Sequence, residues 1–79
     1  MSVTVRYWAG ARAAAGVGED TEVPGETLRE VVAEVVRRRP ALAPVVAVAT
    51  LLVEGARGVL DQPVAAGVVV EVLPPFAGG

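Results

Sequence analysis

The chain contains no cysteine, no histidine and no lysine. Without cysteine it has neither a disulfide nor a thiol nucleophile, and without histidine it lacks the commonest metal ligand and general base. The lack of lysine excludes Schiff-base chemistry, and Ser2 is the only serine. A self-contained catalytic site is hard to assemble from what remains, and we expect no metal site. The candidate reactive groups are the carboxylates, Tyr7 and the two chain ends.

The composition also limits the surroundings in which the chain works. Its 79 residues carry a net charge of -2, which argues against a protein that coats nucleic acid. The longest apolar stretch, Ala41–Val53, is interrupted by Pro44 and falls short of the ~20 residues that span a bilayer. A secreted domain this small often needs disulfides, and the N-terminus shows no signal-peptide pattern. We expect a cytoplasmic protein with no nucleic-acid or membrane partner.

Alternation of polar and apolar residues predicts the strands. Val3, Val5 and Tyr7 alternate with Thr4, Arg6 and Trp8, which predicts a half-buried strand over Ser2–Ala9. The other expected segments are a short helical turn within Ala11–Ala15, strands over Thr21–Val23, Thr50–Glu54 and Val68–Leu73, a glycine-bracketed turn at Gly55–Gly58, a short edge strand at Val59–Leu60, and a loop with a short turn over Pro40–Ala49.

One helix is strongly indicated over Thr27–Arg38. Thr27 and Glu30 have the spacing of a capping box, and apolar residues then follow with helical spacing. Pro40 ends the helix. The run Arg37–Arg39 either complements the negative end of the helix dipole, the interpretation we favour, or forms a basic docking patch. One helix over a small mixed sheet of four to five strands is an α+β architecture, and we assign residues 1–73 to this domain.

The outward side of the predicted sheet carries large apolar residues. If Val3, Val5 and Tyr7 face the core, Trp8 faces away from it, and the same alternation turns Leu73 outward on the last strand. Exposed residues of this kind indicate a surface that binds a partner. The alternative, that a loop covers Trp8, stays open.

Residues 74–79 form an extended tail. Pro74 and Pro75 stiffen its start, Phe76 offers one apolar anchor, and Gly78-Gly79 end the chain with no side chain near the carboxylate. This combination suits a carboxylate that enters a narrow partner active site. The alternative is an ordinary frayed terminus.

The run Leu73-Pro74-Pro75-Phe76-Ala77-Gly78-Gly79 after a valine-rich strand resembles the C-terminus of the small subunit of molybdopterin synthase, the MoaD type of the ubiquitin-like sulfur carriers. The opening Val3–Ala9, followed by Ala11–Gly16, is similar to that family's first strand and short helix. The resemblance implies a β-grasp fold, in which the first and last strands lie side by side.

The resemblance also implies a reaction and its partners. A ubiquitin-activating-type adenylyltransferase uses ATP to adenylate the carboxylate of Gly79, and a sulfur donor enzyme then replaces AMP to give a thiocarboxylate. The tail then inserts into the large subunit of molybdopterin synthase and supplies sulfur for molybdopterin. The inserted residues before Gly79 are Pro74, Pro75, Phe76, Ala77 and Gly78. The chain itself is a non-catalytic carrier with no bound cofactor. We assign to its partner surface Trp8, Arg12, Arg57 and Leu73.

Two classes of alternative remain open. The same tail serves sulfur carriers for cysteine, thiamine or specialised-metabolite synthesis, and ubiquitin-like modifiers that form amide bonds to other proteins. A plain binding module that uses the Trp8 and Leu73 face would leave the tail inert. The sequence does not identify the final sulfur acceptor.

Overall fold

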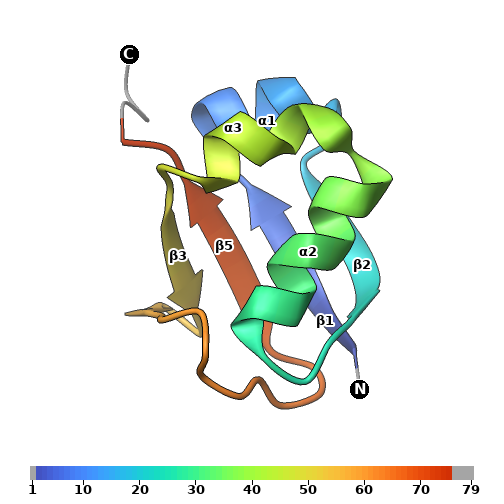
Figure 1. Ribbon diagram of the computed structural model, residues 1–79, viewed down its shortest axis with the longest axis vertical. Coiled ribbons are helices and arrows are strands. Elements are labelled where there is room, and N and C mark those ends of the chain that lie inside the picture. Colours follow the sequence, from blue (N-terminus) through green and yellow to red (C-terminus); the bar gives the residue numbers. More distant parts are fainter. Residues whose placement is uncertain (1, 76–79) are drawn as a thin grey trace.

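The computed structural model describes residues 2–75, in which five strands form one mixed sheet (Figure 1). The strand order is β2-β1-β5-β3-β4, with β1 and β5 parallel and the other pairs antiparallel. The strands are β1 (Ser2–Tyr7), β2 (Glu19–Pro24), β3 (Thr50–Val53), β4 (Ala56–Arg57) and β5 (Val69–Leu73). The first and last strands are therefore neighbours, as expected.

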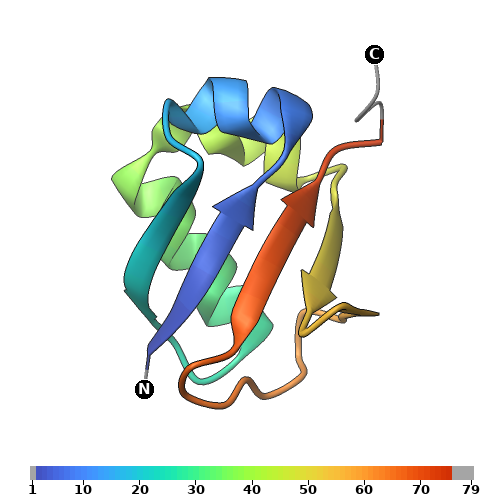
Figure 2. The same cartoon turned by 180° about the vertical axis from the view of Figure 1, so that it is seen from behind.

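The helices lie on one face and at one end of the sheet. The main helix is α2 (Leu28–Arg38), which crosses one face and is followed by the 3-10 turn η1 (Pro40–Leu42) and the short helix α3 (Ala43–Val46). Helix α1 (Ala9–Ala15) lies at the end of the sheet toward which β1 and β5 run. Figure 2 shows that the opposite face of the sheet carries no helix. The predicted α+β, β-grasp arrangement is confirmed. No helix in this part of the chain combines the length and the apolar composition that crossing a bilayer requires.

Helix α2 begins where the capping residues predicted it. The Oγ1 of Thr27 accepts a hydrogen bond from the Glu30 N–H at 3.3 Å, and Oε1 of Glu30 accepts one from the Glu26 N–H at 2.8 Å. The helix buries Leu28, Val31 and Val35 against the sheet. Truncating a fully buried leucine such as Leu28 to alanine costs about 2–5 kcal/mol, because lost burial and a cavity add together.

The core follows the predicted alternation along the two central strands. Val3, Val5 and Tyr7 of β1 and Val70 and Val72 of β5 are each no more than 2% exposed. The remaining buried apolar residues come from the helices, the other strands and one loop: Ala11, Ala15, Val23, Leu28, Val31, Val35, Leu42, Leu51 and Val64.

Two predicted segments differ in the structure for local reasons. The first strand ends at Tyr7, because the Trp8 carbonyl already accepts the N–H of Ala11 at 2.9 Å and starts α1. The segment Pro40–Ala49 holds η1 and α3 in place of most of the expected loop. Pro44 lies in the first turn of α3, where a helix requires no hydrogen bond from the backbone nitrogen.

The predicted edge strand at Val59–Leu60 is wrong, and so is the predicted turn at Gly55–Gly58. Glu54 and Gly55 both have positive φ, 51° and 82°, which is the conformation of a tight two-residue hairpin turn. The chain therefore reverses two residues earlier than expected, and Ala56–Arg57 pairs with β3 as the edge strand.

Candidate functional site

The root of the predicted tail is held between β3 and α1. Leu73, the last residue of β5, pairs with Thr50 of β3. Pro74 is partly buried and Pro75 is exposed. A Cβ built on Gly10 would lie 4.0 Å from Cγ of Pro74, so the start of α1 lies against this proline. The other predicted tail residues, Phe76, Ala77, Gly78 and the reactive Gly79, lie outside the described residues.

Trp8 lies beside this root, on the face of the sheet that no helix covers. Its side chain is 47% exposed, and its indole N–H donates a hydrogen bond of 3.0 Å to Oε2 of Glu71 on β5. Its backbone N–H donates to the Val72 carbonyl at 3.2 Å. The outward orientation predicted from the alternation is confirmed. The hydrogen bond holds the ring at a fixed place on the surface.

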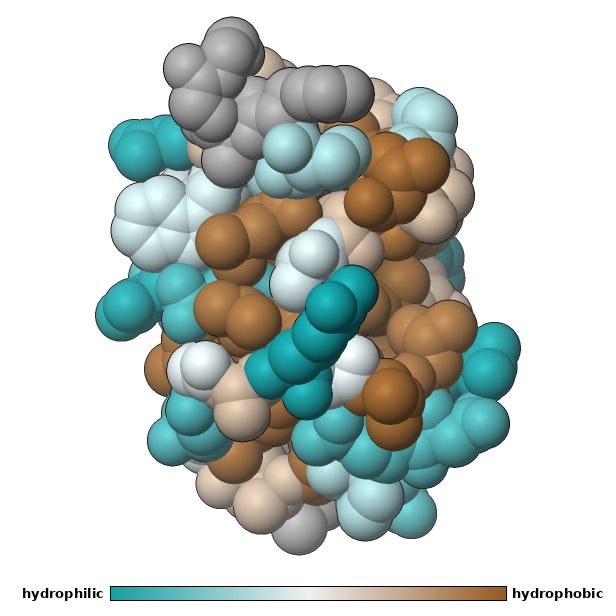
Figure 3. All heavy atoms as spheres, turned by 90° about the vertical axis from the view of Figure 1, so that its left-hand side faces the viewer, coloured by the Kyte–Doolittle hydropathy of each residue, from teal (hydrophilic) through white to brown (hydrophobic). Residues whose placement is uncertain are grey.

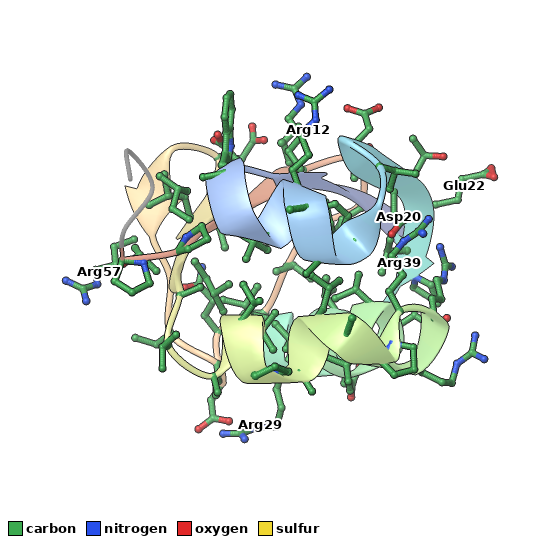
Figure 4. The ribbon with its side chains drawn as sticks, turned by 90° about the horizontal axis from the view of Figure 1, so that it is seen from above. Arg12, Asp20, Glu22, Arg29, Arg39 and Arg57 are labelled. Atoms are coloured by element: carbon green, nitrogen blue, oxygen red, sulfur yellow. The ribbon has the colours of Figure 1, made fainter. Side chains whose placement is uncertain are left out.

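Arg12 lies next to Trp8 on α1. A hollow of about 290 Å³ is lined by Arg6, Tyr7, Trp8, Arg12, Gly18 and Glu19. The guanidinium of Arg12 lies over Gly18, where an added Cβ would stand 3.6 Å from its carbon. Figure 4 shows the Arg12 side chain pointing outward from α1, to the side opposite α2 and α3. An aromatic ring and a cation therefore share one depression near the tail root.

Arg57 stands on the edge strand β4, and its side chain points out from the edge of the sheet (Figure 4). It pairs in register with Leu52, which pairs with Glu71, the acceptor of the Trp8 N–H. Residues that face each other across strands lie on the same side of a sheet. Leu73 stands two residues after Glu71 and shares that side. Trp8, Arg12 and Leu73 thus lie near the tail root on the face without helices, and Arg57 stands at the edge of the sheet on the other side of the root.

The three arginines at the end of α2 form ion pairs with acidic residues of the same chain. Arg37 and Arg38 both bind the carboxylate of Glu34, at 2.6 Å and 2.9 Å. These bonds, that of Arg37 first, lower the pKa of Glu34 to about 2. Arg39 turns back across the molecule toward β2 and pairs with Asp20. The docking-patch interpretation is not supported, and for Arg39 the ion pair with Asp20, not the helix dipole alone, explains the charge.

A buried charge network joins β1, β2 and the end of α2. Two guanidinium nitrogens of Arg39 donate to the two carboxylate oxygens of Asp20, each at 2.7 Å, and the Tyr7 hydroxyl donates to Oδ2 of Asp20 at 2.7 Å. The hydrogen bonds from Arg39, despite burial, lower the pKa of Asp20. Burial and the neighbouring carboxylate raise the pKa of Tyr7. Every charge in the network is therefore occupied, and Tyr7 is no longer a candidate reactive group.

Sequence reasoning did not find this network or the acceptor of the Trp8 N–H. Asp20 and Arg39 are 19 residues apart and belong to different elements, so no local pattern connects them. The available signal was Asp20 itself, a charged residue at the start of a strand that faces the core. Within residues 2–75, no group of three acidic, histidine or cysteine side chains is arranged to hold a metal ion.

The chain is similar in sequence to one protein family and in structure to several solved proteins. The model of the ThiS family matches residues 5–79. No curated protein matches the chain by sequence. A putative molybdopterin converting factor, subunit 1, from Pyrococcus furiosus is 30% identical, with 96% of this chain and 99% of that chain covered and a TM-score of 0.84.

Two further solved structures are similar over nearly the whole chain. SAMP1 from Haloferax volcanii is 25% identical, with both chains fully covered and a TM-score of 0.86. A chain of the BexX/CysO complex from Amycolatopsis orientalis is 26% identical, with 98% of this chain and 99% of that chain covered and a TM-score of 0.80. The similar structures are thus named for different functions.

Proposed function

The chain belongs to the ThiS family of ubiquitin-like sulfur carriers, and we propose that it delivers sulfur from Gly79 for molybdopterin synthesis. In this role it is the small subunit of molybdopterin synthase. The observation that carries the choice of pathway is the similarity to the subunit from P. furiosus, which extends over 96% of this chain. The terminus Leu73–Gly79, which resembles that of molybdopterin synthase small subunits, supports the same choice.

The proposed chemistry begins at a carboxylate that is a poor electrophile. An oxygen of the Gly79 carboxylate attacks the α-phosphorus of ATP on the activating enzyme, and pyrophosphate leaves. A hydrosulfide ion released by the donor then attacks the carbonyl carbon of the acyl-adenylate. The carbon–oxygen bond to AMP breaks, AMP leaves with the bond electrons, and the proton on sulfur passes to solvent. The product is a thiocarboxylate whose sulfur passes to the acceptor. The chain has no cysteine, histidine or lysine to assist, so each of these steps depends on groups of the partner proteins.

The length of the tail explains why the surface around its root matters. The four residues that follow Pro75 reach at most about 14 Å when fully extended. A partner that surrounds the carboxylate of Gly79 must therefore come close to the domain at Pro75. Trp8 and Leu73 lie at this place, and Arg12 and Arg57 lie at its two sides. These four residues are the surface that we propose for the activating enzyme and for the large subunit.

A second candidate function is that of a protein modifier. The observation in its favour is the similarity to SAMP1, with a TM-score of 0.86 over the full length of both chains. In that case an amine of a target protein attacks the activated carbonyl of Gly79, AMP leaves, the nitrogen loses a proton and an amide bond forms. The similarity to a chain of the BexX/CysO complex keeps carriers for other sulfur acceptors as the third alternative.

Reconstitution with the acceptor tests the pathway. The thiocarboxylated chain is mixed with the molybdopterin synthase large subunit of the same organism and a sulfur-free pterin precursor. We expect the precursor to be converted to molybdopterin and the chain to return to the carboxylate form. A chain that ends at Gly78 is the matched control and should give no product.

Other outcomes would contradict this proposal in different ways. A thiocarboxylated chain that gives no molybdopterin with an active large subunit, but supplies sulfur to another acceptor enzyme, would remove the pathway and keep the carrier. Amide-linked conjugates through Gly79, formed with the activating enzyme and no sulfur donor, would support the modifier.

A further inference from the structure

A groove of about 470 Å³ lies at the edge of the sheet, beside the tail root. It shares Arg57 with the surface described above and is otherwise lined by different residues. Its floor and sides come from the end of α3, the start of β3 and the loop after β4. Apolar side chains line much of it, including Val46, Leu51, Val59 and Leu60. Thr50, which pairs with Leu73, also lines the groove and connects it to the tail root.

Large apolar side chains are concentrated at this edge. Among residues 2–75, three of the five exposed large apolar residues lie in or beside the groove: Val48 is 64% exposed, Val59 67% and Leu60 39%. Val48 stands between Ala47 and Ala49, which both line the groove. Figure 3 looks onto this edge and shows brown hydrophobic residues on both sides of a hydrophilic strip. Exposed apolar side chains gathered in this way on a small domain indicate an interaction surface.

The loop that presents Val59 and Leu60 is fixed by hydrogen bonds. The Gly58 N–H donates to the Leu51 carbonyl at 2.8 Å, and the Val59 N–H donates to Oε1 of Gln62 at 2.8 Å. The Leu60 carbonyl accepts the Arg29 N–H at 2.8 Å. The groove therefore exists before a partner arrives, so binding there requires little ordering of the loop.

The charges around the groove specify what it accepts. Arg29 is neutralised by Asp61, with 3.0 Å between Nη2 and Oδ1. The guanidinium group of Arg57 makes no hydrogen bond or ion pair to any residue within 2–75. Glu54, in the turn before β4, accepts the Val69 N–H at 2.7 Å and forms no ion pair with Arg57. One cation beside an apolar groove is thus left without a counterion from the described part of the chain.

We propose that this edge groove is a second docking surface, which takes an apolar side chain of a partner protein together with a carboxylate that pairs with Arg57. The inference rests on the proposed function, because the partner is a protein that acts on the tail. Charge complementarity identifies the acidic group, and Thr50 makes the groove continuous with the surface around the tail root. A partner held within about 14 Å of Pro75 by the short tail reaches past Arg57 into this groove.

Binding measurements with two variants test the proposal. Val59→Asp places a charge on the apolar side of the groove, and Arg57→Glu reverses its cation. Calorimetric titration with the activating enzyme, and separately with the large subunit, should show at least about tenfold weaker binding to one of them. Val17→Asp, at another exposed valine in the loop after α1, is the matched control and should bind as the wild type does. Arg57→Lys keeps the charge and should restore most of the affinity.

The remaining outcomes overturn the proposal. Wild-type affinity of Val59→Asp for both partners would show that the groove is not used, even if Arg57→Glu binds more weakly, because Arg57 also belongs to the surface around the tail root. Amide shifts of Val59 and Leu60 that change when residues 76–79 are removed from the free protein would assign the groove to the chain's own tail. A dimer in sedimentation that Val59→Asp dissolves would assign it to a second copy. If wild-type chain binds both partners but is never adenylated, the proposed function fails separately, and weaker binding of the variants still supports the groove.

Discussion

Two arginines at opposite sides of the molecule, Arg39 and Arg57, differ in what surrounds them (Figure 4). Arg39 forms two hydrogen bonds of 2.7 Å to Asp20 and one of 3.1 Å to the Ala15 carbonyl. Arg57 has no such partner among residues 2–75 and lies beside exposed apolar side chains. The first arginine joins elements of the fold, and the second is available at the surface where the tail begins. The molecule thus separates the charges that hold it together from those that a partner can use.

The ion pair with Arg39 allows a charged residue, Asp20, to lie in the interior of the molecule. Asp20 is 9% exposed, and it would be destabilising there without Arg39 and the Tyr7 hydroxyl. Together these three residues link the end of α2 to β1 and β2. Among the described residues, Trp8 and the residues of the tail root take no part in this network, so substitutions of them should affect binding more than folding.

Removing Gly79 should have the largest effect on function. We expect the shortened chain to show no thiocarboxylate formation, because the carboxylate of Gly78 stands one residue too short for the partner active site. Its free energy of unfolding should stay within about 0.5 kcal/mol of the wild-type value, because terminal residues outside a core contribute little. Urea unfolding and mass spectrometry measure the two quantities. Retained loading would show that the reactive group is not at the end of the tail.

Replacing the acceptor at the buried side should have the largest effect on stability. Asp20→Ala leaves the Arg39 guanidinium and the Tyr7 hydroxyl without their shared acceptor, and we expect a loss of about 2–3 kcal/mol in the free energy of unfolding. Arg57→Ala is the matched change at the open side and should alter it by less than about 0.5 kcal/mol. Equal effects of the two substitutions in urea unfolding would contradict the comparison.

Alkaline pH should weaken the fold through Tyr7. Its pKa is raised in the folded protein, first by burial and then by the Asp20 carboxylate, so the folded state holds this proton more tightly than the unfolded state. The stabilisation is complete below the unfolded pKa of about 10 and is lost as pH rises above it, by up to about 1.4 kcal/mol per pH unit. The chain has one tyrosine and no cysteine or lysine, and arginine side chains stay charged, so no other side chain titrates in this range.

Tyr7→Phe provides the control for that pH dependence. The variant should lose about 1.5 kcal/mol at neutral pH, because the hydroxyl no longer donates to Asp20. Its stability should then stay flat between pH ~9 and ~11, where that of the wild type falls. Denaturation midpoints measured across this range decide the matter, and a parallel decline in both proteins would assign the effect to another group.

The smallest effect that we predict is at Trp8. Trp8→Ala should weaken binding of the activating enzyme by about tenfold, because an exposed aromatic ring held by a hydrogen bond is a typical anchor of an interface. The free energy of unfolding should change by less than about 1 kcal/mol, since the ring is 47% exposed. Calorimetric titration measures the binding, and urea unfolding followed by circular dichroism measures the stability, because the variant has no tryptophan left to fluoresce. Undiminished affinity would remove Trp8 from the partner surface.

The sequence predicted elements whose signals are local. The capping residues Thr27 and Glu30 and the alternation in β1 depend on neighbours a few residues away, and both predictions are confirmed. The edge strand was misplaced because Val59 and Leu60 have the apolar character of a strand, whereas the turn is decided by the backbone conformation at Glu54 and Gly55.

The parts of the site that could not be predicted depend on contacts between distant segments. The indole N–H of Trp8 meets Glu71 only because β1 and β5 are neighbours, and these two residues are 63 positions apart. The groove likewise combines the end of α3 with the loop after β4. The reactive end of the tail was identified from its residues alone, and it stays a prediction.

The central claim is that Gly79 carries sulfur, and one measurement tests it most directly. The chain with a native C-terminus is incubated with its activating enzyme, ATP and a sulfide source, and its intact mass is determined. The account predicts a gain equal to the replacement of one oxygen by one sulfur, located at Gly79 by fragmentation. An unchanged mass, with an activating enzyme that releases pyrophosphate in the presence of the chain, would contradict it.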